Sequence, residues 1–174
     1  MPAAAPENTM SPDQPRSAIV SLNSEADIVI TRAFTAPRAL VFEAWTTPEH
    51  VRRWYGTGEM RMTACEIDLR VGGRWRYVLE QADGGATHEF SGEFIDVTPP
   101  ECLITTERYD AFPGGDHVNT MTLTEEQGVT AMHLHARYAS RADRDGRMAD
   151  GLEEGVQSTL DRFAALLDAL AAER

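Results

Sequence analysis

Between Glu59 and Tyr138 the sequence repeats one pattern. Short runs rich in Val, Ile, Thr, Tyr, Phe and Trp are separated by turn signals such as Gly72-Gly73 and Gly84-Gly85. β-branched and aromatic residues favour strands, and the glycine pairs favour tight turns. Strands joined by tight turns pair antiparallel. We therefore predict a meander of six strands, at about 59–70, 74–81, 86–97, 102–110, 117–124 and 129–138.

The segment from about Asp145 to Ala172 has the spacing of one long amphipathic helix. Its apolar residues recur at steps of three and four, and the stripe comprises Met148, Leu152, Val156, Leu160, Phe163, Leu167 and Leu170. Such a stripe has to be buried, and the only large apolar surface that the sequence offers is the concave face of a curved sheet. The predicted fold class is α+β, with a curved antiparallel sheet wrapped around a long C-terminal helix.

The part before the meander predicts one strand and two short helices. A β-branched run from about Ala26 to Phe34 reads as a strand, which brings the sheet to about seven strands. Pro37 suits the first turn of a helix, and Thr47 is placed to cap a second one that begins at Pro48. Residues 1–24 hold four prolines among small polar residues, so we expect a disordered tail followed by one domain over residues 25–174.

Charge and cysteine usage restrict the partners and the compartment. The net charge of −12 opposes binding to phosphate backbones and to anionic membrane surfaces. No apolar run approaches the roughly 20 residues of a membrane helix. Cys65 and Cys102 lie in apolar runs and are interpreted as buried thiols, and the N-terminus lacks the pattern of a secretory signal, so we expect a cytoplasmic protein. Homodimerisation through an exposed sheet edge stays open.

Several short motifs occur in a fixed order along about 140 residues. They are Arg32-Ala33-Phe34-x-Ala36-Pro37, Val41-Phe42-x-Ala44-Trp45-Thr46-x-Pro48-Glu49, Trp54, Asp68-x-Arg70-x-Gly72-Gly73-x-Trp75, Gly92-Glu93-Phe94, Pro99-Pro100-Glu101 and Gly155. In this the sequence resembles the START-like superfamily, whose helix-grip fold is that of the birch-pollen allergen. Within it, the chain is similar to the family named after the C-terminal domain of the activator of the heat-shock-protein-90 ATPase.

The resemblance implies an apolar cavity between the sheet and the last helix, used in this superfamily for small apolar molecules, and it implies no cofactor. Family members often carry an aromatic residue after the glycine that corresponds to Gly155. Val156 stands there in this chain. The smaller side chain either leaves more room beneath the helix or is compensated by a neighbour.

Alternation along the strands identifies candidates for the lining of that cavity. Trp75 and Tyr77 share one face of their strand, and Phe90 and Phe94 share one face of the next. The alternative is that these side chains are ordinary core. The complete candidate set is Trp54, Trp75, Tyr77, Phe90, Phe94, Met121, Met132 and Val156.

Polar candidates are fewer. His88 has the parity of Phe90 and is a candidate general base, with Glu107 as a second group for proton transfer. The sequence does not settle which face of strand 102–110 is the inner one. Asp68 and Arg70 are expected to form a structural polar pair at the hairpin, with Glu66 as a third member.

Metal binding and nucleophilic catalysis have little support. His133 and His135 stand two residues apart, a spacing that suits a metal when a third ligand such as His117 joins. His133 and His135 lie on the strand face opposite Met132, so we expect their side chains to point outward, and we predict no metal site. Motifs such as G-x-S-x-G, H-E-x-x-H and the phosphate-binding loop are absent from the sequence.

Three hypotheses for function follow. The first is a binding protein that holds a small hydrophobic molecule in the cavity. The second is an enzyme of the cyclase or hydrolase type that uses His88 and Glu107 in the same cavity. The third is a chaperone-associated interaction module, which the family's name implies.

Overall fold

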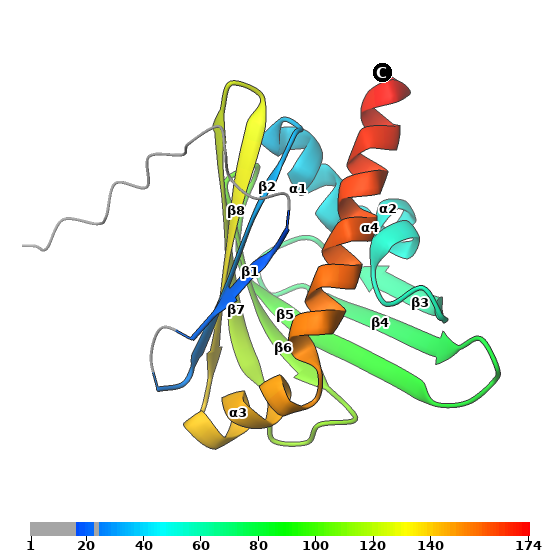
Figure 1. The fold of residues 1–174 in the computed structure, drawn as a ribbon, viewed down its shortest axis with the longest axis vertical. Coiled ribbons are helices and arrows are strands. Elements are labelled where there is room, and N and C mark those ends of the chain that lie inside the picture. Colours follow the sequence, from blue (N-terminus) through cyan, green and yellow to red (C-terminus); the bar gives the residue numbers. More distant parts are fainter. Residues whose placement is uncertain (1–16, 23–24) are drawn as a thin grey trace, which may run out of the picture.

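One antiparallel sheet surrounds one long helix in the computed structural model, which describes residues 17–22 and 25–174 (Figure 1). The sheet order is β1-β2-β8-β7-β6-β5-β4-β3. The strands are β1 (Ile19–Ser21), β2 (Asp27–Phe34), β3 (Met60–Ile67), β4 (Arg74–Gln81), β5 (Thr87–Thr98), β6 (Cys102–Tyr109), β7 (His117–Glu126) and β8 (Val129–Tyr138). The helices are α1 (Arg38–Thr46), α2 (Pro48–Trp54), α3 (Arg141–Ala149) and α4 (Leu152–Ala172). The predicted α+β class and meander are confirmed.

The prediction of a disordered tail through residue 24 is wrong for Ile19–Ser21, which form β1. Ile19 pairs with Thr31 and Ser21 with Val29, which adds an eighth strand at the edge of the sheet. The segment is also fixed to α4, because the amide side chain of Gln157 accepts from the Ala18 N–H at 3.1 Å. Ala18 is buried in the core and Val20 packs against it, but this apolar run is only three residues long and follows four prolines, so the composition of the whole tail concealed it. Residues 1–16, 23 and 24 of the predicted tail lie outside the described residues.

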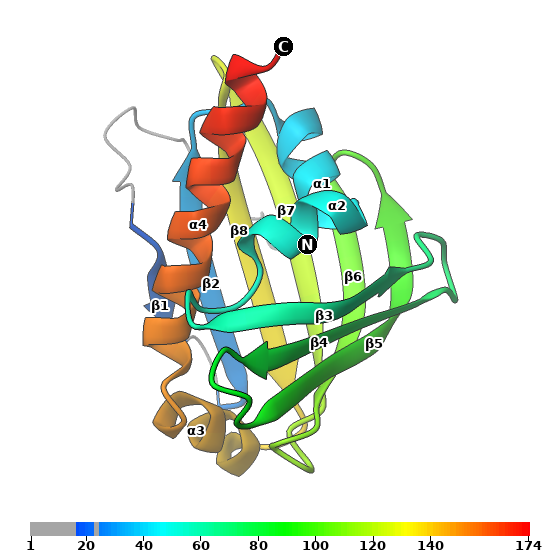
Figure 2. The same ribbon diagram turned by 90° about the vertical axis from the view of Figure 1, so that its right-hand side faces the viewer.

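Two irregularities bend the sheet. The register of β3 against β4 shifts between Met62 and Ala64. A second shift separates Phe94 from Asp96 on β5. A bulge bends its strand and increases the local twist. Figure 2 shows the result: β3, β4 and β5 run across the direction of β7 and β8, and the sheet curves around the side on which the helices lie.

The single C-terminal helix predicted over 145–172 is two helices. α3 ends at Ala149, and Gly151 has a φ of +79°, a conformation that suits glycine and interrupts the helix. Ser140 starts α3 by accepting a hydrogen bond from the Asp143 N–H at 3.1 Å. Met148 of the predicted stripe therefore belongs to α3, while Leu152 and the residues after it remain on α4.

The C-terminal half of α4 packs on an aromatic core. The Phe163 ring lies edge-on to Phe34, Trp45 and Trp54, with centroids 5.1, 5.3 and 4.7 Å away. Trp54 Nε1 donates to the carbonyl of Ala44 at 3.0 Å, which ties α2 to α1. Buried aromatic clusters of this kind contribute strongly to stability. This half of the helix is therefore anchored to α1, α2 and the sheet.

An ion pair also links the sheet to α4. The Arg32 guanidinium on β2 is buried and lies 2.7 Å from a carboxylate oxygen of Asp161 on α4. Thr47 occupies the position before α2, as predicted, but its side chain makes no capping hydrogen bond.

None of the helices within residues 17–22 and 25–174 has both the length and the apolar character that crossing a membrane requires.

Gly92 on β5 provides a test of the packing. A Cβ there would lie 1.9 Å from the Thr106 carbonyl oxygen and 2.6 Å from Trp75 Nε1. We expect Gly92→Ala to lower the free energy of unfolding by about 2–3 kcal/mol, because the clash is with backbone. Gly58→Ala, where a Cβ would meet nothing within 4 Å, is the control. Equal stabilities of the two variants in urea denaturation would contradict this packing.

Candidate ligand cavity

A cavity of about 400 Å³ lies between the inner face of the sheet and the N-terminal half of α4. Its boundary includes the end of α2, the junction of α3 with α4, and side chains of the seven strands β2 to β8. Every tryptophan and every tyrosine of the chain borders it: Trp45, Trp54, Trp75, Tyr55, Tyr77, Tyr109 and Tyr138. The anchored half of the helix thus closes a solid core, and the other half covers an open space.

The structure places every predicted lining residue at this cavity. The eight are Trp54, Trp75, Tyr77, Phe90, Phe94, Met121, Met132 and Val156, and the polar candidates His88 and Glu107 border it as well. Trp54 contributes mainly to the core, since it is 2% exposed and packs on Phe163. Their role in binding a ligand stays a prediction.

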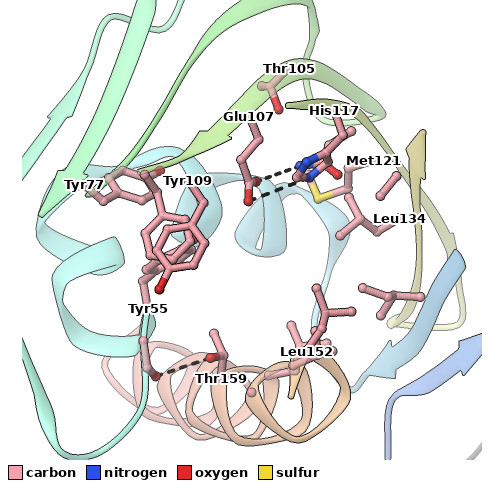
Figure 3. Close-up of a pocket in the computed structure, with 18 of the residues that line it drawn as sticks. Tyr55, Tyr77, Thr105, Glu107, Tyr109, His117, Met121, Leu134, Leu152 and Thr159 are labelled. Atoms are coloured by element: carbon pink, nitrogen blue, oxygen red, sulfur yellow. Dashed lines mark hydrogen bonds and ion pairs between the residues drawn. The ribbon is translucent and has the colours of Figure 1, made fainter. Parts of the chain in front are cut away.

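One side of the cavity is a continuous set of aromatic rings from Tyr55, which follows α2, and from β4, β5 and β6. Tyr55 and Tyr77 meet edge to face with centroids 4.8 Å apart, and Trp75 lies 4.9 Å from Tyr77. Phe90 and Tyr109 are stacked at 4.4 Å across the β5–β6 pair. Figure 3 shows Tyr55, Tyr77 and Tyr109 together on this side.

Beside these rings, β6 and β7 carry a polar group that we call the Glu107 cluster: Glu107, His117 and Asn119. Asn119 Nδ2 donates to Glu107 Oε2 at 2.8 Å, and His117 Nε2 lies 3.8 Å from Glu107 Oε1 (Figure 3). The strand face that the sequence left open is thereby settled, because Thr105, Glu107 and Tyr109 line the cavity. Arg108, of opposite parity, is exposed and pairs with Asp116 at 2.8 Å.

The ring of His117 is held in place by two neighbours besides Glu107. Its Nδ1 lies 3.0 Å from the Gly115 carbonyl oxygen, and the ring is stacked on Tyr138 at 4.4 Å. A carbonyl oxygen can only accept, so Nδ1 carries the proton. In the neutral imidazole, Nε2 is then an unprotonated acceptor that faces Glu107.

A second polar group lies where α3 approaches the sheet. The Tyr109 hydroxyl and His88 Nδ1 are 2.6 Å apart, and the Arg147 guanidinium lies over the Tyr109 ring at 4.9 Å. Arg147 also pairs with Asp150 at 3.3 Å. His88 Nε2 is buried and has no partner among the described residues. His88 and Glu107 therefore belong to different groups, each with its own partner.

The metal alternative fails on geometry. His117 points into the cavity, whereas His133 is exposed on the outer face and His135 pairs with Asp27 at 3.0 Å. The three imidazoles cannot converge on one ion. No group of three metal-ligating side chains occurs among the residues that the structure describes.

The hairpin pair is simpler than predicted. Arg70 Nε lies 2.9 Å from Asp68 Oδ2, but both side chains are more than half exposed, so the pair adds little stability. Glu66 does not join them and instead approaches Arg76 at 3.6 Å. The hairpin is held by backbone hydrogen bonds, including that from the Gly72 N–H to the Phe94 carbonyl at 2.8 Å.

Sequence reasoning missed several residues of the cavity. His117 and Asn119 share the strand parity of Met121, which was predicted to face inward, so alternation alone would have found them. Tyr138 has the parity of Met132 and could have been found in the same way. Arg147 had no such signal, because its position depends on the break between α3 and α4.

Burial keeps the tyrosines and one thiol protonated. It raises the pKa of Tyr55 well above that of a free phenol, raises the pKa of Tyr77, and raises the pKa of Tyr138 to about 12. The negative charge of Glu107 raises the pKa of all three further. Burial also raises the pKa of the free thiol Cys65 to about 11. The hydroxyls are therefore hydrogen-bond donors at neutral pH.

These shifts predict the alkaline behaviour. At pH 10, where an unfolded tyrosine is half ionised, the folded protein should show much less phenolate absorbance near 295 nm than the same protein in urea. Because the folded pKa values lie above the unfolded value, stability is retained below pH 10 and falls as the pH rises toward 12. A native circular dichroism spectrum combined with half-ionised tyrosines at pH 10 would contradict the buried placement.

Comparisons with known proteins agree with this fold. The family described as "Activator of Hsp90 ATPase homolog 1-like protein" matches residues 35–168. A crystal structure from Rhodobacter sphaeroides is 26% identical, with a TM-score of 0.81 over 88% of this chain and 99% of that one. Structures from Nitrosomonas europaea (24%, TM-score 0.77, covering 87% and 99%) and Mycobacterium smegmatis (24%, 0.77, 87% and 96%) share the fold.

No curated protein matches the chain. The family match covers most of the described domain, and the sheet and C-terminal helix have the arrangement of the helix-grip fold. The chain therefore belongs to the family of activator of Hsp90 ATPase homolog 1-like proteins, within the START-like superfamily.

Proposed function

We propose that the protein binds a small, largely apolar molecule in the cavity beneath α4. The observation that carries this proposal is the cavity of about 400 Å³, bordered by aromatic and aliphatic side chains and by a few polar groups that point into it. Binding sites for small molecules commonly have this composition.

The size of the apolar surface sets the expected affinity. A ligand that removes about 400 Å² of apolar surface from water gains roughly 10 kcal/mol. Association costs at least about 4 kcal/mol. The remaining free energy corresponds to a dissociation constant of roughly 10–100 μM. Polar contacts in the cavity would make the affinity for a matching ligand higher.

An acid–base enzyme is a second candidate, supported by the Glu107 cluster. His117 Nε2 and the Glu107 carboxylate lie side by side at the surface of an apolar cavity, which suits proton transfer to or from a bound molecule. His88 is less suited than the sequence suggested, because Nδ1 is engaged by Tyr109 and Nε2 is buried. A chaperone interaction is supported by the family name alone.

Filling the cavity tests the binding proposal. Val156 lies on α4 at the cavity, so Val156→Trp should occupy part of the space and weaken binding of the neutral fluorophore N-phenyl-1-naphthylamine at least tenfold. Glu153→Trp adds the same ring one turn earlier at an exposed position and should leave binding unchanged. Fluorescence titration measures both, and circular dichroism checks the fold.

The outcomes separate clearly. Absence of any fluorophore binding to the unmodified protein would contradict the proposal. Equal affinities of Val156→Trp and the unmodified protein would place the bound fluorophore elsewhere and would contradict it as well.

A further inference from the structure

We propose that the molecule bound in the cavity carries a protonated primary amine, held by Glu107 Oε1 and His117 Nε2. This inference rests on the proposed binding function and names the chemical class of its ligand. The remainder of the ligand is apolar and faces the aromatic and aliphatic parts of the lining.

The charges at the cavity leave one carboxylate without a cationic partner. Its charged side chains are Glu107, Arg147 and Asp150, and Arg147 pairs with Asp150 at 3.3 Å. Glu107 forms no ion pair with an arginine among the described residues, and its partners are the neutral amide of Asn119 and the imidazole of His117. A carboxylate in apolar surroundings is costly unless a positive charge or donors compensate it. An ammonium group would supply both.

The geometry of the two acceptors suits an ammonium better than a hydroxyl. With the proton of His117 on Nδ1, Nε2 and Glu107 Oε1 are both acceptors, and their separation of 3.8 Å exceeds a hydrogen bond. A nitrogen at about 2.9 Å from each atom would donate to both. An ammonium has three donors, whereas a hydroxyl has one and would leave one acceptor unpaired. The sequence contains no lysine, so no side-chain ammonium of this chain competes for the position.

The surroundings favour a cation in two further ways. The faces of aromatic rings attract cations, and the rings of Tyr55, Tyr77 and Tyr138 border the same cavity as Glu107. The net charge of −12 attracts cations to the protein from solution and repels anions. A ligand with a carboxylate would meet Glu107 with the same sign of charge.

Three probes that differ in one group test the proposal. They are 4-phenylbutylamine, 4-phenylbutan-1-ol and 4-phenylbutanoate, titrated by calorimetry at pH 7.5 with the full chain. We expect the amine to bind at least tenfold tighter than the alcohol and the carboxylate to bind weakest. Glu107→Gln should reduce the preference for the amine to less than threefold. Glu93→Gln, which removes one charge from an exposed position on β5, should retain it.

Each outcome is decisive. Equal binding of the three probes, or preference for the carboxylate, would overturn the amine proposal and leave the apolar binding function intact. Preference for the amine that persists in Glu107→Gln would also overturn it. Failure of all three probes and of N-phenyl-1-naphthylamine would instead remove the binding function itself. The comparison of probes on the unmodified protein remains informative even where a variant does not fold.

Discussion

The unequal packing of α4 determines what this molecule can do. Phe163 and the leucines that follow it fill the space against α1, α2 and the sheet, whereas the turns before Leu160 face an open cavity. Thr159 and Arg162 strengthen this arrangement by donating to the Gly56 carbonyl at 3.3 and 2.8 Å. The helix is therefore held firmly at one half, and the other half covers the cavity without having to fill it.

The polar side chains of the cavity form two separate groups, which come from different elements of the fold. Glu107, His117 and Asn119 come from β6 and β7, and His88, Tyr109 and Arg147 gather where α3 approaches β5 and β6. Both groups have partners on the protein, but Arg147 pairs with Asp150, whereas Glu107 has no arginine partner in the part of the chain that the structure describes. A largely apolar cavity with such a carboxylate favours ligands of matching shape and opposite charge.

Much of the fold could be predicted because it depends on local patterns. The strand alternation of Trp75, Tyr77 and Met132 identified the inner faces of their strands. The failures have equally physical reasons. β1 depends on a run of only three apolar residues that follows a proline-rich segment, so the composition of the tail concealed it. The break between α3 and α4 depends on the left-handed backbone conformation of Gly151. The spacing of apolar residues along the segment does not predict such a break. The inner face of β6 has mixed polarity, so alternation could not decide it.

Methionine methyl resonances report whether a small apolar molecule enters the cavity. Met121 and Met132 border the cavity, and Met148 on α3 does not. In a titration with N-phenyl-1-naphthylamine, we expect saturable shifts of the Met121 and Met132 methyl signals and little change at Met148. Methyl signals of Met121 and Met132 that stay unchanged at saturating fluorophore would contradict binding in the cavity.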